Sequence, residues 1–259
     1  MGHERVGTLP RTRQWRQLVD ALAASAGAPV VVPALANETL TRVRSRLDGV
    51  ADDPGFAACF QFLVLLARGE IRPSTRLADE GAPREAQSYN AQLLETVGAL
   101  QEWVAPHQSS LEYADLGVRA AADAIAYWVD RHHGQEELFG DSRSYAQLWA
   151  DANNGAAFSE ISRAFFARFI DHYLQYFLGR EASGVLPSDD ARSRFDGALS
   201  SHADALARHA FESTKIAQSF AAGWYNKHVK GGRPTEKAVR GFLAHAIGKL
   251  REELRRESA

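Results

Sequence analysis

Helical periodicity runs through almost the whole chain. Apolar side chains recur every three or four residues, the spacing that places them on one face of an α-helix. A strand-like pattern is confined to residues 28–33, APVVVP, where prolines bracket three valines. We therefore predict an all-α protein, a single globular bundle of about eight helices with no significant β-sheet. Residues 1–259 are expected to form one domain, with residues 179–187 as the place for a soft boundary.

Two segments are expected at the centre of the bundle. Residues 54–69 are apolar nearly all round, and residues 158–178 carry apolar rows on two sides. A helix of either kind is buried between its neighbours rather than laid on a surface.

A third apolar stripe follows a helix that should begin at Ser188. The stripe extends from Phe195 to Trp224, and Gly223 within it is interpreted as a close-packing or kink position. Gly231 and Gly232 are expected to end this helix in a left-handed turn.

The stretch SFAAGWYNKH, residues 219–228, offers several side chains suited to ligand binding. Most of it is explained as the end of the helix, because Lys227 and His228 would favour the helix dipole in its last turn. Tyr225 and Asn226 are expected to point away from the stripe. Any ligand contact in this stretch should therefore centre on these two residues.

His202 and His209 are two helical turns, about 10.5 Å, apart. Both fall on the core-facing stripe, and the distance is too long for the two imidazoles to hold one metal ion directly. We interpret them as core histidines with local hydrogen-bond partners, and we predict no metal site. A pH-sensitive or ligand-binding role is the alternative.

Arg168 and His172 lie one turn apart in an aromatic helix, FARFIDHYLQYF. A buried arginine needs a carboxylate or several carbonyl groups as partners. The pattern predicts a structural salt bridge, and a pocket that holds an anionic ligand is the alternative.

The last helix, predicted at about 234–257, combines a docking stripe with a basic face. Its apolar residues fall on one side, and its four glutamates are expected to lie outside the basic sector. Small residues separate the bases of that sector, which are Lys237, Arg240, Arg251 and Arg255.

Charge is unevenly distributed along the chain. Residues 227–259 carry nine Lys or Arg against four Glu, and residues 1–16 carry four Arg against one Glu. Residues 17–226 therefore account for −10 within a total of −2. Arg11, Arg13 and Arg16 join the basic helix as candidate contacts for an anionic partner.

Several classes of function leave no trace in the sequence. Gly-rich phosphate loops, GxSxG and HExxH motifs are missing, and Cys59, the single cysteine, sits in an apolar run. No cofactor is predicted. The absence of a long apolar segment argues against membrane insertion and favours the cytoplasm. An excess of arginine over lysine, 25 to 5, is compatible with a GC-rich bacterial genome.

We expect a non-enzymatic helical adaptor or scaffold subunit of a larger intracellular assembly. A protein partner would contact the basic C-terminal helix and the Arg-rich N-terminus. One alternative is a nucleic-acid-binding accessory module, as in a bacterial defence or other multi-gene system. Another is a small-ligand binder or enzyme in which Arg168, His172, His202, His209 and Tyr225 converge.

Overall fold

The predicted all-α fold is confirmed. Every regular element is helical and no strand occurs in the part of the chain that the computed structural model describes. That part consists of residues 12–25, 28, 32–42, 47, 49–71, 89–107, 111–137, 144–212 and 220–257.

Ten α-helices and two short 3-10 helices are described, slightly more than the eight expected. Part of the difference comes from the segment after Ser188, which forms two helices instead of one. The α-helices are α1 (Arg13–Ser25), α2 (Val32–Arg42), α4 (Pro54–Ala67), α5 (Tyr89–Val104), α6 (Leu111–Glu137), α7 (Tyr145–Asp151), α8 (Gly155–Val185), α9 (Asp189–Glu212), α10 (Phe220–His228) and α11 (Glu236–Glu257). The 3-10 helices are η2 (Val50–Asp52) and η4 (Ala105–His107).

Residues 28–33 have a strand-like pattern, but the last two of them are helical. Val32 and Pro33 are the first two residues of α2, so an extended conformation is wrong for them. A proline is tolerated in the first turn of a helix because the N–H it lacks has no intrahelical partner there. Residues 29–31 lie outside the described part.

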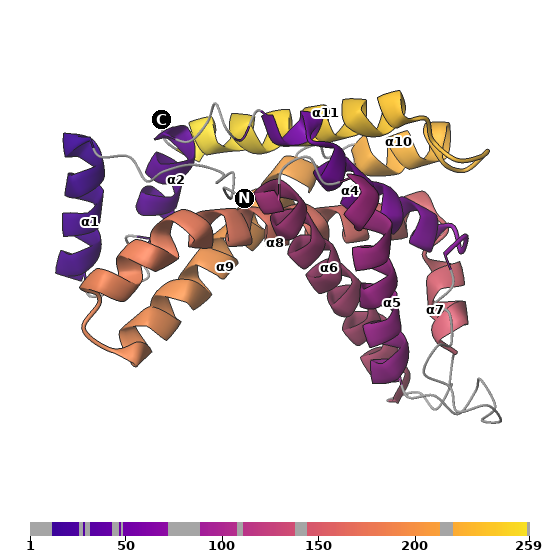
Figure 1. Ribbon diagram of the computed structural model, residues 1–259, viewed down its shortest axis with the longest axis horizontal. Coiled ribbons are helices and arrows are strands. Elements are labelled where there is room, and N and C mark those ends of the chain that lie inside the picture. The colour runs from indigo at the N-terminus through magenta and orange to yellow at the C-terminus, as the bar shows by residue number, and fades with distance from the viewer. Residues whose placement is uncertain are drawn as a thin grey trace.

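The longest helix, α8, runs through the middle of the molecule (Figure 1). It contacts α6 along one side and α9 along another, and α10 packs near its beginning. Both predicted apolar rows are buried, including Phe165 in one row and Phe166 in the other. Residues 179–185, within the proposed soft boundary, continue this helix without a break.

Helix α4 is the second central element. All its residues except Pro54 and Gln61 are buried, which confirms the prediction from its apolar pattern. It begins at Asp53, whose carboxylate accepts a hydrogen bond from the Phe56 amide at 2.8 Å. Cys59 is fully buried here, and burial together with nearby Asp53 raises the pKa of its thiol. The thiol is therefore a core group and not a reactive nucleophile.

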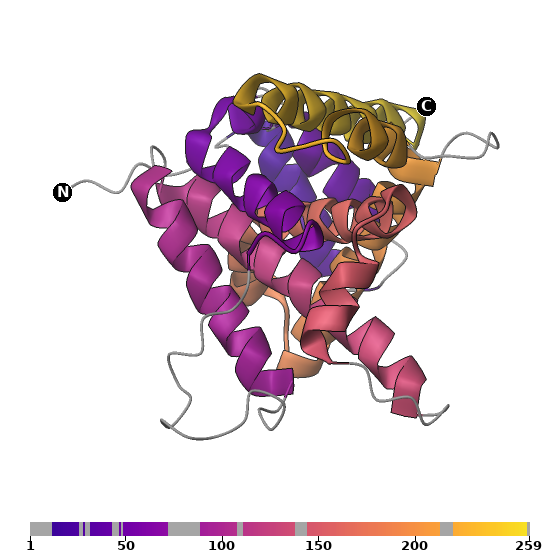
Figure 2. The same ribbon diagram turned by 90° about the vertical axis from the view of Figure 1, so that its right-hand side faces the viewer.

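Helix α11 lies across one side of the bundle in both views (Figures 1 and 2). Its apolar stripe, including Phe242 and Leu243, is buried against the body of the protein, where α11 contacts α9 and α4. Thr235 caps its start by accepting a hydrogen bond from the Ala238 amide at 3.2 Å.

The connection from α10 to α11 contains Gly231 and Gly232. The left-handed turn predicted there is wrong, because the one positive φ among the described glycines belongs to Gly69. The amides of Val229 and Lys230 instead donate to the carbonyl of Tyr225 as α10 ends.

Candidate functional site

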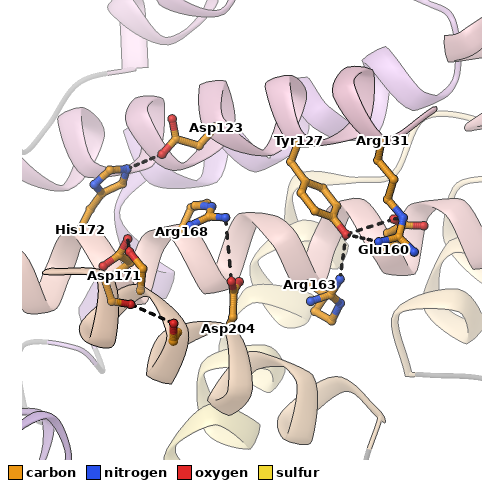
Figure 3. A network of polar contacts seen from close by, with 12 residues as sticks. Asp123, Tyr127, Arg131, Glu160, Arg163, Arg168, Asp171, His172 and Asp204 are labelled. Atoms are coloured by element: carbon orange, nitrogen blue, oxygen red, sulfur yellow. Dashed lines mark hydrogen bonds and ion pairs between the residues drawn. The ribbon is translucent and has the colours of Figure 1, made fainter. Parts of the chain in front are cut away.

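Arg168 and His172 lie on α8 and face carboxylates on two different helices (Figure 3). Arg168 Nη2 is 3.9 Å from Asp204 Oδ2 on α9, and His172 Nε2 is 2.8 Å from Asp123 Oδ2 on α6. Both side chains are about one-quarter exposed, at 28% and 25%. The ion pair of Arg168 and the hydrogen bond of His172 therefore join α8 to its neighbours.

The two candidate histidines on α9 have different surroundings. His202 is buried, and its Nε2 lies 3.1 Å from Asn37 Oδ1 on α2. His209 is exposed, so the prediction of a core position is wrong for it. The buried arc of α9 is centred on Leu206 and Ala210 rather than on the histidines, which lie at its edge.

Tyr225 was expected to point away from the apolar stripe, and this is wrong. It is fully buried against α8, and its hydroxyl donates to Asn153 Oδ1 at 2.7 Å. Burial raises the pKa of Tyr225, an effect that nearby Arg68 partly offsets, so the phenol remains a hydrogen-bond donor. Trp224 is only half-buried and Asn226 is exposed.

The six predicted pocket residues do not share a pocket in the described part of the chain. Arg168, His172, His202 and Tyr225 each contact a different partner, and the side chains of His209 and Asn226 are exposed. The four partnered residues each join two elements of the fold: α8 to α9, α8 to α6, α9 to α2, and α10 to the start of α8.

A polar cluster that the sequence did not reveal lies between α6 and α8 (Figure 3). The Tyr127 hydroxyl accepts hydrogen bonds from Arg131 Nη1 at 3.1 Å and from Arg163 Nη2 at 3.2 Å. Glu160 pairs with Arg131 Nε at 2.8 Å. The spacing of Tyr127 and Arg131 by one helical turn was a possible signal, but nothing in the sequence places Glu160 and Arg163 opposite them.

A cavity of about 300 Å³ borders this cluster, between α6, α7 and α8. The indole N–H of Trp128 is buried without a hydrogen-bond partner, and the buried Nε2 atom of His132 makes no hydrogen bond but lies 3.7 Å from Glu160 Oε2. None of the six predicted pocket residues lines the cavity. Its lining residues are Trp128, His132, Leu148, Asp151, Asn154, Ala156, Ala157 and Glu160.

A buried carboxylate, Asp171, links α8 to α9. It accepts hydrogen bonds from Ser200 Oγ at 2.6 Å and from Gln175 Nε2 at 3.3 Å. Burial raises the pKa of neighbouring Asp196, and the negative charge of Asp171 adds to the effect. This group again connects helices and opens on no described cavity.

The predicted basic face of α11 is less positive than expected. Glu236 lies one turn from Arg240 and pairs with it at 2.6 Å, so this glutamate does not lie outside the basic sector. Lys237 is exposed and Arg251 is half-buried, while the side chain of Arg255 lies outside the described part. Two further pairs on this helix are Lys249–Glu252 and Arg256–Glu253.

The N-terminal arginines are described only in part. Arg13 and Arg16 are exposed on α1, and Arg11 lies outside the described residues. Helix α1 contacts α8 and lies at the end of the molecule away from the connection between α10 and α11 (Figure 1).

Exposed positive charge gathers where α10 turns into α11. We call this surface the cationic turn and define it as Lys227, Lys230, Arg233 and Lys237, all exposed. None of its three lysines has a carboxylate within ion-pair distance among the residues described. The turn projects at one end of the molecule (Figure 1).

The cationic turn is fixed to the end of α4 by Arg68 and Glu70. Arg68 Nη1 donates to the carbonyls of Val229 and Gly232, the latter at 2.9 Å. A guanidinium in this position also favours the dipole of α10. Glu70 accepts hydrogen bonds from both Arg68 and Arg233, so one carboxylate joins the two arginines.

The charge on Glu70 should make the stability of the protein depend on pH. Burial raises the pKa of Glu70, but hydrogen bonds from Arg233 and Arg68 outweigh this and hold it below its usual value. A carboxylate with a lowered pKa in the folded state stabilises that state above the unfolded pKa, and the effect is lost as pH falls through the folded pKa. We expect Glu70→Gln to lower the free energy of unfolding by about 1 kcal/mol or less at neutral pH, and by less near pH 3.

Urea unfolding of the wild type and of Glu70→Gln, at neutral and acidic pH, measures this difference. Glu236→Gln serves as the control because its side chain is 71% exposed. An equal loss for Glu70→Gln at both pH values would contradict the expected role of the charge.

The described helices include none long and apolar enough to cross a membrane. Likewise, no group of three or more His, Cys, Asp or Glu side chains in the described ranges is arranged to hold a metal ion. Comparisons with protein-family models, with curated proteins and with solved structures find no match. The chemistry of the described surface is therefore the basis for any functional argument.

Proposed function

We propose that the protein is a non-enzymatic helical adaptor that joins a larger assembly by docking the cationic turn on an anionic partner. The observation that carries the proposal is the exposed, unmatched charge of Lys227, Lys230 and Lys237. An unpaired lysine contributes little to the fold, whereas a cluster of them attracts and orients an oppositely charged partner.

Several polar groups of the body are paired between helices. Arg168, His172 and Asp171 join α8 to its neighbours, and Arg131 pairs with Glu160 between α6 and α8. Contacts of this kind fix the arrangement of helices without presenting convergent groups to a substrate. The three lysines of the turn differ from these groups, because they are exposed and have no carboxylate partner among the described residues.

The turn is also preorganised for binding. Its carbonyls are held by Arg68, and Arg233 is held by Glu70. A surface that is already ordered in the free protein avoids most of the entropy cost of ordering on binding.

The outward face of α11 continues from the turn and offers further contact area. Gly241 and Gly248 have open space where a side chain would lie, and Ala244 between them is exposed. A partner docked on the turn can therefore approach the backbone of α11 closely. Arg13 and Arg16 on α1 are candidates for a second contact.

Charge reversal at the turn tests the proposal in cells that make the protein naturally. The variant carries Lys227→Glu, Lys230→Glu and Lys237→Glu, and we expect its binding to the assembly to weaken at least about tenfold. Size-exclusion chromatography of gentle lysates should then show the wild type in a large complex and the variant free.

The matched control reverses three exposed charges elsewhere, Arg180→Glu, Arg194→Glu and Arg208→Glu on α8 and α9. It should remain in the complex. Wild-type protein that elutes free, or a turn variant that stays in the complex, would refute the proposal.

A further inference from the structure

We infer that the anionic partner of the cationic turn is the phosphate backbone of a double-stranded nucleic acid. The inference rests on the proposed function, because it names the partner that docks on the same surface.

The turn exposes charge and backbone but no large apolar side chain. Val229 is fully buried, and Trp224 and His228 are half-buried against each other with ring centroids 5.8 Å apart. The one large hydrophobic residue exposed in the described part, Leu94, lies on α5. Protein–protein interfaces need an apolar core, whereas nucleic-acid interfaces are polar and strongly positive. The turn therefore fits the second kind of partner.

The same absence of exposed apolar groups argues against a lipid surface. A segment that binds membranes stably usually inserts apolar side chains in addition to its charges. The absence of exposed aromatic rings among the described residues of the turn also favours a duplex over a single strand, because single-strand binders stack bases on such rings. Asn226, exposed beside Lys227, supplies a hydrogen-bonding amide instead.

Lysine is concentrated on this part of the chain. All five lysines lie between residues 215 and 249, while the rest of the chain uses arginine for positive charge. An ammonium group acts as a mobile point charge that contacts phosphates without requiring a fixed bidentate geometry. Such contacts bind the backbone of any sequence and release its counterions.

Two glycines let a phosphate approach the turn closely. Neither Gly231 nor Gly232 has a positive φ, and no neighbouring atom lies within 4 Å of where a Cβ would be. The described fold therefore does not require glycine at either position. Without side chains, this part of the turn leaves room for a phosphate between Lys230 and Arg233.

Fluorescence anisotropy with the purified full-length chain and a labelled DNA duplex of about 20 base pairs tests the inference. If four cations contact phosphates, the slope of log K against log salt should be about −3.6, and affinity should fall about 150-fold between about 50 and 200 mM NaCl. The variant with Lys227→Gln, Lys230→Gln and Lys237→Gln should show a slope near −1 and a fall of about 3-fold.

The matched control, Arg180→Gln, Arg194→Gln and Arg208→Gln, removes the same charge from exposed positions on α8 and α9. It should keep the wild-type slope. No binding at low salt, equal weakening by the two triple variants, or tighter binding to a single strand or to vesicles rich in anionic lipid would overturn the inference.

Nuclease treatment of the native complex separates this inference from the proposed function. Release of the protein by nuclease supports a nucleic-acid partner. A complex that survives nuclease but is lost on charge reversal at Lys227, Lys230 and Lys237 would support the adaptor function and refute a nucleic-acid partner. A protein that forms no complex at all, yet binds the duplex with the expected slope, would refute the adaptor function but not nucleic-acid binding.

Discussion

Replacing Phe60 with alanine is expected to lower the free energy of unfolding by about 3–5 kcal/mol, the usual cost of truncating a buried aromatic ring. Phe60 is fully buried on α4 at the point where α8, α10 and α11 meet. Its ring stacks on Phe242 of α11, with centroids 4.9 Å apart and an interplanar angle of 16°. The other rings within contact are Phe158, Phe165, Phe166 and Trp224.

Chemical denaturation of the two proteins measures the loss. Leu94→Ala is the matched control, because Leu94 is 69% exposed and its truncation should change stability by no more than about 0.5 kcal/mol. A loss below about 1.5 kcal/mol for Phe60→Ala would mean that this junction is not the close-packed centre described above.

The centre of the fold was predictable because it depends on pattern alone. A helix that is apolar nearly all round, such as α4, has no side suited to water, and α8 with two apolar rows must lie between neighbours. Both conclusions hold for any arrangement of the other helices. The sequence could therefore identify these two elements without knowing what surrounds them.

The apolar stripe from Phe195 to Trp224 shows what helical periodicity cannot predict. Helical periodicity can continue across a break, and the stripe is shared between two helices, α9 and α10. Once α10 is a separate helix, its buried face is set by its packing on α8. Tyr225 is then fully buried while Trp224 is only half-buried, the reverse of what the continuous stripe predicted.

The sequence also left open which glycines are closely packed and which charges are paired. The sequence predicts a close-packing or kink position at Gly223. Close packing is wrong there, because no atom lies within 4 Å of its would-be Cβ, whereas a Cβ at Gly155 would lie 3.0 Å from the Ala222 carbonyl oxygen. The sequence likewise located the cations of α11 but not the partner of Arg240. Both properties belong to pairs of residues, and only the structure shows which members meet.

Gly117→Ala is the second substitution with a large expected effect. A Cβ at Gly117 on α6 would lie 2.9 Å from Cys59 Sγ and 3.0 Å from Phe56 Cδ2 on α4. Both of these side chains are fully buried and cannot move aside without disturbing the core. Overpacking of this kind typically costs about 1–3 kcal/mol, and we expect a net loss of stability of that size.

The comparison with Gly98→Ala isolates the close approach of α6 to α4. Gly98 is also inside a helix, α5, but nothing lies within 4 Å of its would-be Cβ. Alanine should stabilise that helix by about 0.5–1 kcal/mol, and the same gain in helix propensity acts at Gly117. Opposite signs for the two variants in thermal or chemical unfolding would therefore assign the loss at Gly117 to packing. If both variants are more stable than the wild type, α6 does not approach α4 as closely as the structure indicates, and the core around Cys59 has room for another methyl group.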